Sequence, residues 1–244
     1  GPVSYIIIGK RGESVTVETI IRPIAHIKSD FTDKFGIPRQ SGLVPELTAR
    51  IVFEPEYRDP NALVGLEGYS HLWLIWQFSE AIRESWSPTV RPPRLGGNQR
   101  VGVFATRSPF RPNPIGLSSV KILSIDFHTE EGPVIMVAGA DLMDQTPIYD
   151  IKPYLPHVDS HPEARGGFAY EVKDYGLNVD FPEEWKRLVP AGKQEALTQI
   201  LEQDPRPSYQ QDPERVYGMS FAGCEVKFRV EGQKLKVIQV IHLQ

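Results

Sequence analysis

The stretch "SHLWLIWQF", residues 70–78, is apolar at nearly every position and rich in aromatic side chains. A short run of this kind, without regular polar alternation, predicts a strand buried on both faces. Strand patterns continue on both sides of it, with only short helical signals between them. So many strands with so little helix predict a closed or sandwiched β-domain. The other strands predicted for this domain lie in "PIAHI" (23–27), "ELTARIVFEP" (46–55), "RVGVFA" (100–105), "IGLSSVKILSIDF" (115–127) and "VIMVAGADL" (134–142).

The pattern changes in the last third of the chain. Within residues 181–205, apolar side chains recur at a spacing of four, as in Ala196 and Ile200, which predicts an amphipathic helix. Residues 224–243 alternate apolar and polar positions around a glycine-containing turn, which predicts a hairpin. We therefore expect three parts: an N-terminal hairpin or leader over residues 1–21, a mainly β domain over 22–158 and a smaller α+β domain over 159–244.

The composition excludes several classes of protein. Of the 244 residues 40% are hydrophobic, but no apolar run approaches the roughly 20 residues that cross a bilayer, so we expect no membrane partner. The N-terminal residues lack a secretory pattern, which favours a cytoplasmic protein. Cys224 is the only cysteine, which leaves no internal disulfide and no cysteine-rich zinc site. The histidines show no metal-binding spacing, and no Rossmann or phosphate-loop motif occurs, so we expect no metal and no nucleotide bound by those loops.

Charge is distributed unevenly along the chain. The net charge of −4 argues against a protein that coats nucleic acid nonspecifically. Residues 85–125 nevertheless contain no Asp or Glu, which predicts a local basic surface for a specific anionic partner. Prolines in the same span would hold an arginine stiffly for a ligand. The alternatives are that these charges lie on different faces and that the prolines only end strands. The basic residues of the span are Arg91, Arg94, Arg100, Arg107, Arg111 and Lys121.

Five stretches carry a resemblance to a known family. They are "PRQSG" (38–42), "GLEGYSHLWLIW" (65–76), "PTVRPPRLGGNQRVGVFATRSPFRPNPIGLS" (88–118), "DLMDQTPIYDIKPYLP" (141–156) and "QDPRPSY" (203–209). Together they resemble the TsaA/YaeB family of S-adenosylmethionine-dependent tRNA adenosine N6-methyltransferases, also called TrmO. The resemblance implies a six-stranded β-barrel methyltransferase, usually a homodimer, with S-adenosyl-L-methionine as its cofactor. The implied substrate is N6-threonylcarbamoyladenosine at position 37, in the tRNA anticodon stem-loop, which the C-terminal module could help to recruit.

The resemblance also places the cofactor against particular residues of this chain. They supply amide, backbone and apolar groups, while Arg107 suits the carboxylate of the cofactor or an RNA phosphate. The expected cofactor residues are Gln40, Ser41, Gly42, Phe78, Ser79, Arg107, Leu117, Asp144, Gln145, Thr146 and Pro147.

Catalytic and RNA-binding candidates complete the predicted site. Asp150, Lys152 and Tyr154 alternate in sequence, so an extended chain would project them to one face. We expect Asp150 or Tyr154 to accept the proton of the acceptor nitrogen and Lys152 to stabilise the developing anion. The alternative is a structural ion pair between Asp150 and Lys152, with Tyr154 as a packing residue. The tRNA-binding candidates are Arg91, Arg94, Arg111 and Arg206, each of which could instead be a solvated surface arginine.

Two other classes of function compete with the methyltransferase. A noncatalytic RNA-binding regulator would bind tRNA with a strong salt dependence but would bind no cofactor saturably. A β-barrel that binds a small molecule would ignore tRNA. Methyl transfer from a sulfonium requires in-line positioning and neither a metal nor a covalent intermediate, so the sequence is compatible with that chemistry.

Overall fold

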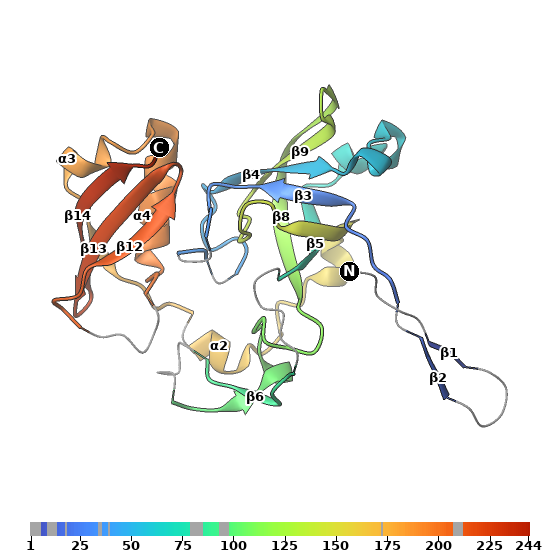
Figure 1. Ribbon diagram of the computed structural model, residues 1–244, viewed down its shortest axis with the longest axis horizontal. Helices are drawn as coiled ribbons and strands as arrows, with labels where there is room; N and C mark the ends of the chain where they lie inside the picture. Colours follow the sequence, from blue (N-terminus) through green and yellow to red (C-terminus); the bar gives the residue numbers. More distant parts are fainter. Residues whose placement is uncertain are drawn as a thin grey trace.

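The chain folds around two separate β-sheet structures (Figure 1). The computed structural model describes residues 6–8, 14–17, 19–33, 36–38, 40–78, 85–92, 98–171, 173–206 and 212–244. Two predicted site residues, Ser79 and Arg94, lie outside this range. Within it, no helix is both long and apolar enough to cross a membrane.

The larger structure is a closed barrel of six strands in the order β10-β3-β4-β9-β8-β5. Every neighbouring pair is antiparallel. The predicted mainly β fold with a β-barrel and a smaller C-terminal domain is therefore confirmed. The strands are β3 (Ala25–Lys28), β4 (Thr48–Phe53), β5 (His71–Gln77), β8 (Ile115–Thr129), β9 (Gly132–Ala138) and β10 (Pro147–Pro153).

The strand β5 corrects one sequence prediction. Leu72, Leu74 and Trp76 are buried, but the residues between them are only partly buried, so the strand is not buried on both faces. A barrel strand turns one face to the core, and the other face must be covered from outside. Here Trp73 packs outside the barrel against Tyr154, with 5.6 Å between ring centroids. Because apolar side chains such as Trp73 also occupy the outer face of β5, the sequence shows an unbroken apolar run.

The predicted strand at 100–105 is also corrected. Its first part forms β7 (Val101–Gly102), which pairs with β6 (Thr89–Val90) as a small ribbon outside the barrel (Figure 1). The backbone N–H of Val103 donates to the carbonyl of Pro88 at 2.9 Å and not to a barrel strand, and a 3-10 turn over Val103–Ala105 follows, closed by the N–H of Thr106 on the Val103 carbonyl at 3.1 Å. Further 3-10 turns cover Pro55–Tyr57, Pro60–Leu63 and Leu66–Gly68.

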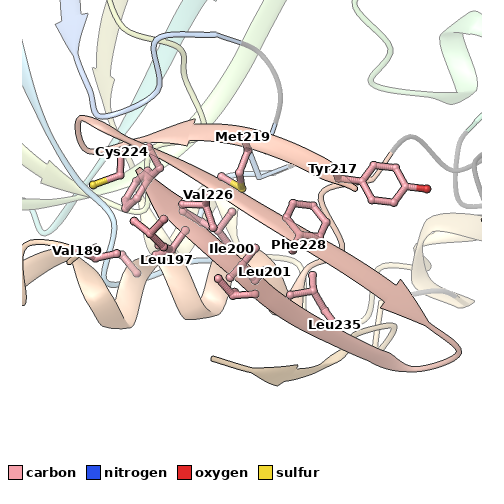
Figure 2. Packing of buried hydrophobic residues seen from close by; sticks show 14 of the residues in the cluster. Val189, Leu197, Ile200, Leu201, Tyr217, Met219, Cys224, Val226, Phe228 and Leu235 are labelled. Carbon is pink, nitrogen blue, oxygen red and sulfur yellow. The ribbon is translucent and has the colours of Figure 1, made fainter. Parts of the chain in front are cut away.

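The smaller structure is a four-stranded sheet covered by helix α4 (Gln194–Glu202). Figure 2 shows Leu197, Ile200 and Leu201 of this helix facing Val226 and Phe228 of the sheet. The predicted helix and C-terminal hairpin are both present, although Pro190 separates α4 from the short helix α3 (Glu183–Lys186). The sheet has the order β11-β14-β13-β12, with β11 (Asn178–Asp180), β12 (Tyr217–Phe221), β13 (Cys224–Glu231) and β14 (Lys234–His242).

Short elements complete the described chain. The N-terminal strands pair as a hairpin, with Ile6 opposite Val17, as the sequence predicts. The remaining elements are β1 (Ile6–Ile8), β2 (Ser14–Val17), α1 (Pro156–Asp159) and α2 (Gly167–Glu171).

The segment between β3 and β4 joins the barrel to the C-terminal domain. Phe31, Val44 and Leu47 from this segment belong to the C-terminal core. Phe31 packs on Phe221 of β12, with 5.3 Å between ring centroids. Lys193 adds an ion pair with Asp30 and thereby ties the start of α4 to the end of β3. The C-terminal domain therefore supports a barrel loop directly.

Candidate functional site

Barrel topology brings distant segments of the chain together at one end. Strands β3, β5 and β9 finish at the end where β4, β8 and β10 begin. The connecting segments 29–47, 78–114 and 139–146 therefore meet there, and we call this the loop end. It carries most of the predicted cofactor residues, which the sequence separates by up to about a hundred positions.

Contacts between these segments fix the loop end. Arg107 donates from Nη1 to Oε1 of Gln40 at 2.6 Å, across 67 residues of sequence. The backbone N–H of Gly42 donates to the carbonyl of Gly139 at 2.9 Å. Gly139 has a φ of +81°, which strains the backbone of any residue with a side chain. A Cβ there would also lie only 3.2 Å from the Gly42 backbone, so this position favours glycine. The predicted Gln40, Gly42 and Arg107 therefore lie in one region.

The turn at 144–147 is fixed to β3 by hydrogen bonds. Asp144 accepts from the backbone N–H of Ser29 at 2.9 Å, and Thr146 donates its hydroxyl to the Met143 carbonyl at 2.6 Å. Gln145 sits between them with a φ of +66° and an exposed side chain. A positive φ is uncommon for a non-glycine residue, and such strain clusters at functional sites. Gln145 is therefore the member of this turn best placed for a ligand, while Asp144 and Thr146 shape the backbone.

A buried polar chain at the loop end escaped the sequence analysis. Trp76 donates from Nε1 to the Ser118 hydroxyl at 2.9 Å, and Ser118 donates to Oδ1 of Asp141 at 2.6 Å. Burial raises the pKa of Asp141 to about 6, against the Ser118 hydrogen bond and the nearby Arg107, which lower it. A carboxylate with a strongly shifted pKa at a loop cluster is a candidate functional group. The only sequence signal was its place within "DLMDQTP".

Gly116 leaves space for the indole ring of Trp76, which begins this series of hydrogen bonds. A Cβ on Gly116 would lie 2.3 Å from Cε2 of Trp76, so no other residue fits beside the indole. Phe78 covers Trp76 with 4.2 Å between ring centroids, and its N–H donates to the Pro114 carbonyl at 2.9 Å. Phe78 thus lies at the loop end, and its contact with the cofactor stays a prediction.

The three catalytic candidates lie on the outer wall of the barrel, formed by β8, β5 and β10. Lys152 Nζ lies 3.5 Å from Oδ2 of Asp150, and both side chains are exposed. Tyr154 follows on the same face, with its ring against Trp73. The predicted common face is present, and so is the alternative ion pair. The roles of these groups stay a prediction.

The outer wall also connects these candidates to a predicted cofactor residue. Asp150 lies opposite Ile75 of β5, and Ile75 lies opposite Leu117 of β8. Residues directly opposite each other in a sheet share a face. Leu117, which is 50% exposed, therefore lies two strands from Asp150 on the outside of the barrel. The nearby Ile115 is exposed as well, which leaves an apolar strip beside the loop end.

The arginine candidates are in different surroundings. Arg91 is exposed beside β6, whereas Arg111 donates to the carbonyls of Thr106 and Ser108 and braces its own loop. Arg206 forms a bidentate ion pair with Asp204 at 2.9 and 3.0 Å, and both side chains are only 11% exposed. Asp204 also accepts from the Tyr175 hydroxyl at 2.6 Å. A tRNA contact from Arg206 stays a prediction, and its present partner is a carboxylate.

Comparison with known proteins decides the family. Residues 26–160 match the family model described as the tRNA-methyltransferase O N-terminal domain, and residues 174–243 match the TrmO C-terminal domain. This chain belongs to the tRNA-methyltransferase O family.

Similar members of the family cover nearly the whole chain. A tRNA (adenine(37)-N6)-methyltransferase from Escherichia coli is 40% identical over 85% of this chain and 91% of its own length. A protein of Pseudomonas aeruginosa named putative S-adenosylmethionine-dependent methyltransferase RcsF is 41% identical over 84% of this chain and 90% of its own. A crystal structure of TrmO from P. aeruginosa superposes with a TM-score of 0.74 at 32% identity, covering 96% of this chain and 100% of that one. The two-domain arrangement of this chain is thus shared with that TrmO structure.

Proposed function

We propose that this protein transfers a methyl group from S-adenosylmethionine to N6 of N6-threonylcarbamoyladenosine at position 37 of tRNA. As a member of the tRNA-methyltransferase O family, it is an S-adenosylmethionine-dependent enzyme that methylates adenine in tRNA. The threonylcarbamoyl group, the metal-free in-line transfer and the roles of individual residues are the parts proposed here. The meeting of Gln40, Arg107 and Asp141 at one end of the barrel is the observation that carries the proposal.

The loop end has groups that fit S-adenosylmethionine. The amino-acid part of this cofactor carries a carboxylate and an ammonium, which a guanidinium and a carboxylate can hold. Arg107 and Asp141 supply that pair, and the backbones of Gly42 and Gly139 lie beside them without side chains that would block an adenosyl group. Phe78 and Leu117 add apolar contact. When bound, the cofactor supplies an electrophilic methyl group on a sulfonium.

The acceptor nitrogen needs help from the protein. N6 of threonylcarbamoyladenosine is a urea nitrogen, whose lone pair is shared with the carbonyl and the ring. In the proposed mechanism Asp150 or Tyr154 takes its proton, and the Lys152 ammonium stabilises the charge that develops on the urea. The ion pair at 3.5 Å keeps Lys152 close to Asp150 on the outer wall. Because the transfer depends on alignment of nitrogen, methyl and sulfur, we propose that no metal takes part.

We also propose that the active protein is a homodimer bound to the anticodon stem-loop. The apolar strip of Ile115 and Leu117 lies exposed between the loop end and Asp150, where a second copy would cover it. Burial of such a strip stabilises association by roughly 25 cal/mol per Å² of apolar surface. The C-terminal module and the exposed Arg91 are the proposed contacts to RNA outside the site.

Labelled cofactor tests the reaction directly. The protein is incubated with methyl-labelled S-adenosylmethionine and tRNA from cells that have or lack the threonylcarbamoyl modification, and the product nucleosides are identified. Label at N6 only in the modified pool is the expected result. Label in both pools would remove the threonylcarbamoyl requirement, and label in neither pool would contradict the proposed reaction.

A further inference from the structure

Two aromatic side chains stand exposed on the surface next to the loop end. Trp86 and Phe104 stack with 6.0 Å between ring centroids and 25° between their planes. They are 53% and 72% exposed. Burial of an aromatic side chain is favourable, so a ring left this open is a place where a partner can gain binding energy. We call this pair the aromatic ledge.

The backbone beneath the aromatic ledge is held in place. Phe104 lies in the 3-10 turn after β7, next to Val103, which is only 1% exposed. The Thr106 hydroxyl donates to the Val103 carbonyl at 2.8 Å and closes this turn. On the other side, the Ser87 hydroxyl donates to the carbonyl of Thr89 at 2.9 Å. Little conformational freedom remains to be lost when a ligand binds, which favours affinity.

Several arginines lie close to the aromatic ledge in sequence. The aromatic ledge lies at the start of the span 85–125, which contains no Asp or Glu. Arg91 is exposed at the end of β6, and Arg100 is exposed with Nη1 3.1 Å from Oγ1 of Thr89. Arg107 of the loop end follows Phe104 by three residues. Exposed aromatic rings accompanied by arginines are complementary to a nucleobase attached to a phosphate backbone.

We propose that the aromatic ledge stacks an unpaired nucleobase of the RNA substrate, next to the base whose N6 is methylated. This inference rests on the proposed function and adds a binding subsite to it. Single-stranded RNA loops expose bases that proteins commonly hold on aromatic rings. Phe104 offers its open face to the base, Trp86 backs it from the other side, and Arg91 and Arg100 neutralise the neighbouring phosphates. The stack fixes the position of the loop and so delivers the adjacent base to the loop end.

Substitutions at Phe104 separate stacking from simple apolar contact. Affinity for a synthetic anticodon stem-loop RNA is measured by fluorescence anisotropy for Phe104→Ala, Phe104→Leu and Phe104→Trp. Alanine and leucine should each weaken binding about 5- to 150-fold, whereas tryptophan should keep it, because only tryptophan preserves a ring face. Tyr69→Ala is the matched control, since Tyr69 is an exposed aromatic residue in the β4–β5 connection, at the other end of the barrel, and should change nothing. Cofactor affinity, measured by calorimetry, should stay the same in every variant.

Removal of single bases from the RNA identifies the stacked position. At one loop position an abasic nucleotide should weaken wild-type binding as much as Phe104→Ala does, and the two changes together should cost no more than one. A leucine variant that binds the stem-loop like the wild type, or the absence of coupling at every loop position, would overturn the inference. So would an alanine variant that dissociates a dimer and leaves RNA affinity intact, because a second copy would then cover the ledge. Coupling without methyl transfer would support the ledge and overturn the proposed function.

Discussion

Replacing Asp141 by asparagine should stabilise the protein at neutral pH. The carboxyl of Asp141 is partly buried at the loop end, where burial raises its pKa to about 6 from an ordinary value of 3.8. A group whose pKa is raised by folding binds its proton more tightly in the folded than in the unfolded chain. Its contribution to stability is therefore most favourable below pH 3.8, declines as the pH rises towards 6, and stays low above that.

The magnitude follows from the size of the shift. Between 3.8 and about 6 lie roughly two pH units, and each unit corresponds to about 1.4 kcal/mol, so ionised Asp141 costs about 3 kcal/mol at pH 7 to 8. Asparagine keeps an oxygen that can accept the Ser118 hydrogen bond but carries no charge. We expect Asp141→Asn to gain about 2 to 3 kcal/mol at pH 8 and nothing at pH 3.5.

Urea unfolding between pH 3.5 and 8 measures this difference. The signal is tryptophan fluorescence, to which Trp73 and Trp76 of the barrel contribute. Glu130→Gln serves as the control, because it removes an exposed carboxylate from the turn between β8 and β9. The free-energy difference between Asp141→Asn and the wild type should grow across pH 4 to 6, while that of the control stays flat. A difference independent of pH, or a variant less stable than the wild type at pH 8, would refute the burial argument.

Three further substitutions test other parts of the structure. Lys152→Met should lower kcat about 100-fold with little change in cofactor affinity, measured by steady-state kinetics and calorimetry; an equal loss of both would exclude a role at the transition state. Phe221→Ala should lower the free energy of unfolding by about 3 to 5 kcal/mol and also weaken cofactor binding through Phe31; stability lost at unchanged affinity would show that the two domains are not coupled. Gly139→Ala should weaken cofactor binding in a titration, because its φ is +81° and Gly42 lies too close; wild-type affinity would show that the loops can move apart.

The barrel was largely predictable because its strands carry their own patterns. The predicted strand at 134–142 is present as β9 up to Ala138, since β-branched residues favour a strand there, but residues 139–142 belong to the loop end. The segment 100–105 has a similar composition, but only Val101 and Gly102 form a strand, and this strand pairs with β6. Which strand a segment pairs with depends on residues far away in sequence, and the composition of the segment does not predict that pairing.

The site was predictable only in part, for the same physical reason. Gln40 and Arg107 were both candidates, but their contact spans 67 residues and depends on closure of the barrel. Asp141 becomes unusual only when folding buries it beside Ser118, and Arg206 loses its exposed character because Asp204 pairs with it. The predicted common face of Asp150 and Lys152 needed no such partner, because alternation along one strand fixes it.

The interlocking of the two domains has a consequence for synthesis on the ribosome. Phe31, Val44 and Leu47 belong to a core that is completed by helix α4 and by the strands β12 and β13, which lie within residues 217–231. At a translation rate of about 5–20 residues per second, these apolar side chains wait roughly 10 to 40 s before their cover emerges. The barrel can close during this interval, but the apolar side chains within residues 31–47 stay exposed until the C-terminal sheet has formed. Chaperones that shield exposed apolar segments are therefore expected to bind the nascent protein at residues 31–47 and to leave once the C-terminal sheet has formed.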